Sequence, residues 1–238
     1  MTARLHALLA AAALGGLLVP DPAVAQDRPG VWIGVLGTSV KARSRYPSGV
    51  EAVSGAAIGG EGGLFWKRLA LRMGYLNGSL TPDTAGPSVR DYIEGYALVG
   101  VRPIAGLELS GGPRARAFVR NVPTPPVIGV SIGDPQAAAE REFTQRWLTW
   151  EIHGRYEGLI VRDIVGGYGE LWAAVTGSVN NADAFDRARG AAAGIVLYLA
   201  RRQIAVRLGY ALDETRLGAA TWRETIRGLT LGVGYGQR

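Results

Sequence analysis

The chain has 238 residues, no cysteine, and a net charge of +6 from 26 Lys and Arg against 20 Asp and Glu. Without cysteine, a disulfide framework is excluded, so stability must come from packing or from a membrane. The basic residues are spread singly and interleaved with glutamates, which argues against nucleic acid as a partner and favours anionic lipid headgroups as the counter-charge.

Residues 1–25 have the pattern of an export signal. Arg4 precedes the apolar run 7–18, and Ala23-Val24-Ala25 supplies the small residues of a cleavage site. We expect cleavage before Gln26 and a single domain over 26–238, with an uncleaved N-terminal anchor as the alternative. No later stretch reaches the ~18 uninterrupted apolar residues of a helical span, so any further span must be built from strands of a closed barrel.

Ten strands are predicted from apolar residues at alternate positions. Most exceed the ~5–6 residues typical of soluble sheets and approach or exceed the ~9–11 needed to cross a bilayer at a tilt. The predicted ranges are 31–43, 51–65, 67–80, 91–102, 106–119, 143–156, 165–178, 190–200, 203–213 and 224–235.

The connections alternate in length. Short turns are predicted at 65–68, 102–106 and 200–203, and longer links at 44–50, 81–90, 121–142, 179–189 and 214–223. Short turns on one rim and long loops on the other are typical of transmembrane barrels, and both termini then lie on the short-turn rim.

Three places depart from this scheme. Gly111-Gly112-Pro113 falls inside the fifth strand, where proline demands a bulge or an interruption. Loss of that strand would leave eight strands as the alternative count. The segment 157–167 is too long for a tight turn and too apolar for an ordinary loop. The link 121–142 carries four prolines, and a link of that length is functional or mobile.

One pattern recurs along the chain. It reads LALRMGYL at 69–76, IAVRLGYA at 204–211 and LTLGVGY at 229–235. Successive strand side chains point to opposite faces, so one face is apolar and ends in tyrosine, while the other holds arginine, glycine and alanine. An apolar outer face with a polar lumenal face is the pattern of a membrane-spanning barrel.

With its export signal, its Gly-Tyr strand ends and its turn rhythm, the chain resembles the outer-membrane β-barrel proteins of Gram-negative bacteria. The resemblance implies an all-β fold, an antiparallel up-and-down transmembrane barrel, in the outer membrane and in contact with phospholipid and lipopolysaccharide. It also implies insertion by the barrel assembly machinery through the last strand, whose alternating residues are Leu229, Leu231, Val233 and Tyr235. Gly236-Gln237-Arg238 follow Tyr235, whereas that family usually ends on the aromatic.

Extending the alternation through every strand assigns one ionic set to the lumen. A network of salt bridges filling the interior is the favoured interpretation, and a selectivity filter or a catalytic set is the alternative. The set comprises Glu61, Arg72, Glu94, Arg102, Glu108, Arg114, Arg116, Glu151, His153, Arg155, Glu170 and Arg207.

His153 is the one candidate catalytic residue, because it is the only histidine after residue 25. Some outer-membrane barrels are hydrolases that need a histidine with a serine or an acid, but no serine stands at a suitable spacing here. We therefore expect no enzymatic activity. No metal site and no cofactor are expected, since acids outside the lumenal set, such as Asp83 and Asp213-Glu214, are interpreted as solvated loop residues.

Four aromatic residues near predicted strand ends suit the membrane interfaces: Trp66, Tyr75, Tyr210 and Tyr235. The alternative is that they are core aromatics of a soluble barrel.

The leading hypothesis is an integral outer-membrane barrel with a structural role or a narrow pore. The alternatives are a soluble periplasmic barrel that binds an apolar ligand and a barrel hydrolase. The soluble alternative reverses the two faces of every strand, with the apolar face inward and the Arg/Glu face in water.

Overall fold

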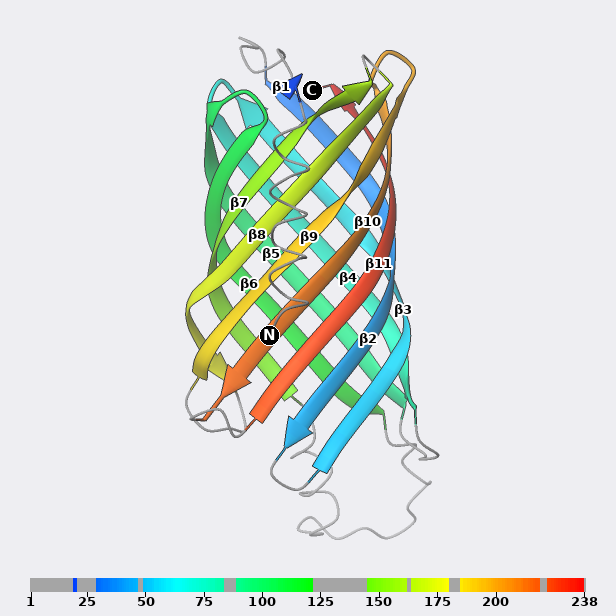
Figure 1. The fold of residues 1–238 in the computed structure, drawn as a ribbon, viewed down its shortest axis with the longest axis vertical. Coiled ribbons are helices and arrows are strands. Elements are labelled where there is room, and N and C mark those ends of the chain that lie inside the picture. The colour runs from blue at the N-terminus through cyan, green and yellow to red at the C-terminus, as the bar shows by residue number, and fades with distance from the viewer. Residues whose placement is uncertain are drawn as a thin grey trace, which may run out of the picture.

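The protein, described by a computed structural model, is a closed antiparallel barrel of ten long strands (Figure 1). The structure describes residues 19–20, 29–46, 49–83, 89–121, 145–161, 164–179, 185–218 and 222–237. Helices are absent from this described part, so it contains no helical membrane span.

The strands confirm the predicted count of ten, and the alternative of eight is wrong. The barrel strands are β2 (Gly30–Tyr46), β3 (Gly49–Trp66), β4 (Leu69–Pro82), β5 (Val89–Ile104), β6 (Leu107–Asn121), β7 (Gln145–Val161), β8 (Val165–Val179), β9 (Phe185–Leu199), β10 (Ile204–Leu217) and β11 (Trp222–Gln237). A two-residue strand, β1 (Val19–Pro20), pairs with β7 and falls inside the predicted export signal. The cleavage site itself lies outside the described residues.

Each barrel strand pairs with its neighbours in the sequence, and β11 closes the ring by pairing with β2 from Arg223↔Arg45 to Gln237↔Val31. The short β3–β4, β5–β6 and β9–β10 turns lie on the rim at the top of Figure 1, and β2–β3, β4–β5, β6–β7, β8–β9 and β10–β11 are joined at the opposite rim. We call these the turn rim and the loop rim. The long link predicted at 44–50 is wrong, because β2 runs to Tyr46 and β3 begins at Gly49.

Several strands are longer than predicted, because the buried alternation continues into polar sequence. Leu159 lies in the extension of β7, Ala188 lies in the early part of β9, and Leu217 ends β10, all three with buried side chains. The predicted links at 157–167, 179–189 and 214–223 are therefore mostly strand. Most of the predicted 121–142 link lies outside the described residues.

The fifth predicted strand forms as β6 although it contains Pro113. Pro113 pairs with Trp150 of β7, while the ladder to β5 skips from Tyr96↔Arg114 to Val99↔Gly111 without a change of register. Proline has no N–H to donate, so the β5 side of the ladder is interrupted there.

The faces of the barrel are those of a membrane protein. The side chains of Leu208 and Tyr235 are 43% and 59% exposed on the outside, whereas Arg72 and Arg207 are 5% and 9% exposed in the lumen. A soluble barrel with an apolar interior requires the opposite arrangement, so the structure contradicts that alternative.

Candidate functional site

The lumen contains a network of ion pairs contributed by most of the barrel strands, with the pairs Arg207–Glu61 and Arg90–Glu51 beside it. All twelve residues of the predicted ionic set lie on inward-facing strand positions. The network has two centres, one nearer the loop rim and one nearer the turn rim.

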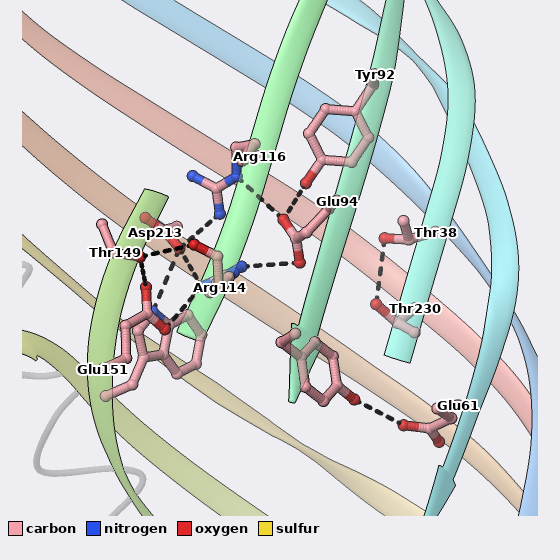
Figure 2. A network of polar contacts seen from close by, with 12 residues as sticks. Thr38, Glu61, Tyr92, Glu94, Arg114, Arg116, Thr149, Glu151, Asp213 and Thr230 are labelled. Carbon is pink, nitrogen blue, oxygen red and sulfur yellow. Dashed lines mark hydrogen bonds and ion pairs between the residues drawn. The ribbon is translucent and has the colours of Figure 1, made fainter. Parts of the chain in front are cut away.

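The loop-side centre holds two arginines between two carboxylates (Figure 2). Glu94 accepts hydrogen bonds from Arg114 at 2.9 Å and from Arg116 at 3.0 Å, and also from Tyr92. Asp213 accepts from the same two guanidinium groups, each at 2.9 Å, through its Oδ2 atom. Each arginine is thus held between two carboxylates in a buried site, where removing one partner is costly.

The turn-side centre is built on Glu170. Its carboxylate accepts from Arg72 Nη2 at 3.0 Å and from Arg155 Nη1 at 3.3 Å. Arg72 also donates to Glu108 at 2.6 Å. On the neighbouring wall, Arg207 donates to Glu61 at 2.6 Å. Arg72 on β4 and Arg207 on β10 thus bridge strands that are distant in the sequence and not adjacent in the sheet, so they tie separate parts of the barrel wall together.

His153 joins the two centres. Its Nε2 lies 3.1 Å from Glu151 and its Nδ1 lies 2.9 Å from Glu170, while its ring stacks on Trp172 with centroids 6.0 Å apart. An imidazole donates from both nitrogens only when it is protonated. Among the described residues, no hydroxyl group hydrogen-bonds to this ring, so its geometry is that of a bridge between carboxylates and differs from a nucleophile–base pair.

Aromatic rings fill the lumen where glycine removes the opposing side chain. A Cβ at Gly74 would lie 2.6 Å from the Tyr96 ring, and one at Gly209 would lie 2.0 Å from the Tyr168 hydroxyl. Glycine on one strand therefore makes space for an aromatic side chain from the adjacent strand, as for Gly74, or from the second strand along, as for Gly209. Gly74 and Gly209 are therefore part of the packing of the lumen.

Apolar clusters lie at both ends of the network. On the loop side, Tyr92, Phe118 and Trp147 pack against each other, with ring centroids 5.3 and 5.5 Å apart, and Leu80 beside them is fully buried. On the turn side, small clusters form around Val196 and around Trp32. Ionic groups thus occupy the middle of the lumen, with apolar side chains towards each rim.

A cavity of about 190 Å³ remains between the clusters. Arg72, Glu170, Tyr96, Ala192 and Gly232 are among the residues that line it. Its lining residues are largely polar or charged, so the space suits ordered water molecules.

Several members of the network were not predicted. The main correction concerns Asp213, which was assigned to the loop acids but is a buried lumenal residue, 6% exposed. Glu224, Glu157 and the pair Arg90–Glu51 were also missed. Asp213, Glu224 and Glu51 are terminal residues of predicted strands, and Arg90 and Glu157 lie one residue beyond such ends. Strict alternation carried through and just past the strand ends would have placed all five inward.

The four predicted interfacial aromatics all point outward and are at least half exposed: Trp66, Tyr75, Tyr210 and Tyr235. Among the described residues, no group of three His, Asp or Glu side chains is placed to hold a metal ion.

A scan against known protein families finds no match, and no curated protein matches the sequence. Among solved structures, the outer membrane protease OmpT from Escherichia coli is similar with a TM-score of 0.55 and 10% identity, covering 89% of this chain and 97% of that chain. The translocator domain of the autotransporter NalP from Neisseria meningitidis aligns with a TM-score of 0.38 and 12% identity, covering 97% and 95%. Ail from Yersinia pestis gives 0.34 and 9%, covering 87% and 99%. The likeness to OmpT shows that the chain has the fold of Gram-negative outer-membrane β-barrels.

Proposed function

We propose that this chain is an integral outer-membrane protein whose lumen is filled and closed, so that its role is structural. The observation that carries the proposal is the inverted barrel, with apolar side chains exposed around its wall and ion pairs buried inside. In water this wall would be a large apolar surface, whereas in a bilayer it is solvated by lipid.

The closed lumen is supported by the two layers described above. The aromatic cluster of Tyr92, Phe118 and Trp147 lies between the loop rim and the ionic centre. Behind it, arginines and carboxylates are paired with each other and leave no continuous row of free charge. A narrow anion-selective pore needs charged side chains that face a path of water through the lumen. Side chains that are paired with each other leave little room for such a path.

The hydrolase alternative has less support. A likeness in fold to a protease carries no catalytic residues to this chain at 10% identity. His153 has a carboxylate at each ring nitrogen, which suits a structural bridge.

For its biogenesis, we propose that the barrel assembly machinery recognises β11. Its outward residues Leu229, Leu231, Val233 and Tyr235 are all about half exposed, and β11 completes the barrel by pairing with β2.

The test of the membrane location uses two arginine substitutions on one strand and one face. Leu71→Arg places a charge in the apolar part of β4, whereas Ser79→Arg places it eight residues towards the loop rim, among polar outward residues. In phospholipid vesicles, Leu71→Arg should lower the free energy of unfolding by about 2–4 kcal/mol and Ser79→Arg by about 0–1 kcal/mol. Equal effects of the two substitutions would refute lipid contact at Leu71.

A further inference from the structure

The outer surface near the loop rim is strongly basic on one side of the barrel. Eight basic side chains point outward from the loop-side ends of β9, β10, β11 and β2, alternating with buried neighbours such as Ala42, Thr215 and Ile226. We call them the basic patch: Lys41, Arg43, Arg45, Arg187, Arg189, Arg216, Arg223 and Arg227.

The strand register brings four of these arginines into one row. Arg187 pairs with Arg216, Arg216 with Arg223, and Arg223 with Arg45, so the row crosses all four strands. Neighbouring strands lie about 4.8 Å apart, and like charges directly opposite each other are destabilising. A row of this kind is electrostatically unfavourable unless anions lie among its members.

The protein supplies little of that negative charge. Glu214 is the main carboxylate on this face, and its oxygens lie 2.9 Å from Arg216 Nε, 3.2 Å from Arg223 Nε and 3.6 Å from Arg189 Nη2. Asp186 lies 3.9 Å from Arg187. Within the described residues, no carboxylate lies in ion-pair range of the remaining members, Lys41, Arg43, Arg45 and Arg227.

The position of the basic patch on the barrel indicates the depth in the membrane at which its ligand would lie. Immediately towards the turn rim, the outward residues of β10 and β11 become apolar, beginning with Leu212 on β10 and Leu229 on β11. If these apolar residues contact acyl chains, then the arginines lie at the level of the lipid headgroups. Opposite the patch, the outward residues near the loop rim on β4 and β5 are Asn77, Ser79 and Asp91, so the positive charge is local.

We propose that the basic patch binds the phosphate groups of lipopolysaccharide in the loop-side leaflet, with its acyl chains against the apolar residues of β10 and β11. Guanidinium groups match phosphate oxygens in bidentate geometry, and four of them across three inter-strand spacings reach over roughly 14 Å. That width suits a headgroup with more than one phosphate better than a singly charged phospholipid. The proposal rests on the membrane location proposed above.

The test compares two triple variants of the full barrel folded in detergent micelles. The patch variant is Arg45→Gln/Arg216→Gln/Arg223→Gln, which removes three members of the row. The control variant is Lys67→Gln/Arg68→Gln/Arg201→Gln, which removes three basic residues at the opposite, turn rim. The probe is fluorescently labelled lipopolysaccharide, and its affinity is measured by anisotropy, with labelled phosphatidylglycerol and dephosphorylated lipopolysaccharide as comparison lipids.

Each basic residue near an anionic headgroup is worth about fivefold in affinity, so the patch variant should bind lipopolysaccharide about 100-fold more weakly. The affinity of the control variant for lipopolysaccharide should stay within about twofold of that of the unsubstituted protein. Dephosphorylated lipopolysaccharide should bind poorly to the patch variant and to the control variant. Equal affinities of the patch and control variants would overturn the proposal. An equal loss for phosphatidylglycerol would overturn the assignment to lipopolysaccharide.

An outcome that refutes lipopolysaccharide binding by the basic patch is distinguishable from one that refutes the membrane location. Heat-modifiable gel migration reports whether each variant is folded. If the triple variant does not fold, the single variant Arg45→Gln replaces it, with an expected loss of about fivefold in affinity for lipopolysaccharide. The Leu71→Arg and Ser79→Arg pair tests lipid contact without involving the patch.

Discussion

Asp213 is the residue whose loss should show most clearly that the lumenal network holds the barrel together. Its Oδ2 atom accepts from Arg114 and Arg116, each at 2.9 Å, and from the Trp172 indole at 3.3 Å. Asp213→Asn keeps the shape of the side chain and removes its charge. Two buried guanidinium groups then share the carboxylate of Glu94 as their nearest counter-charge.

Removing one partner of a buried ion pair costs about 3–5 kcal/mol. Because Glu94 remains within 3.0 Å of both arginines, we expect Asp213→Asn to lie at the lower end, with a loss of about 3 kcal/mol in the free energy of unfolding. The measurement is urea unfolding of the barrel in phospholipid vesicles, followed by tryptophan fluorescence.

The matched control is Asp91→Asn, the same chemical change on the outside of β5, where Asp91 accepts from Ser79 in an exposed contact. It should change the free energy of unfolding by less than about 0.5 kcal/mol. If Asp213→Asn costs no more than this control, the network does not stabilise the fold. A changed dependence on urea would instead show that the substitution alters the surface exposed on unfolding.

Two further predictions concern packing and closure. A Cβ at Gly78 would lie 2.1 Å from the carbonyl oxygen of Ala56, so Gly78→Ala should cost about 1–3 kcal/mol. Gly37→Ala, with no heavy atom within 4 Å of the added Cβ, should not be destabilising in the same unfolding assay; equal costs would contradict the packing argument. In planar bilayers, the unsubstituted protein should show no steady ion conductance, whereas Phe118→Ala/Trp147→Ala should leak because it empties the aromatic cluster. Steady conductance of the unsubstituted barrel would refute the closed lumen.

The strand count and the two faces of the barrel could be predicted from the sequence because they depend on local periodicity. Alternation at 69–76 and 204–211 fixes which side chains share a face, whatever the rest of the chain does. The short turns at 65–68 and 200–203 likewise act over a few residues. The strand ends were less predictable, because polar residues such as Thr215 look like loop residues until a lumen exists to bury them.

The partners within the lumen and on the outer wall were decided by the tertiary structure alone. Arg72 meets Glu170 across 98 residues, and Arg207 meets Glu61 across 146. Arg45 reaches Arg223 because β11 closes the ring on β2. Closure of the sheet into a barrel bridges these distances in sequence, because it brings the first and last strands together and places inward residues of distant strands within reach of one another. Side-chain alternation determines the face of a residue, whereas closure of the barrel determines its neighbour.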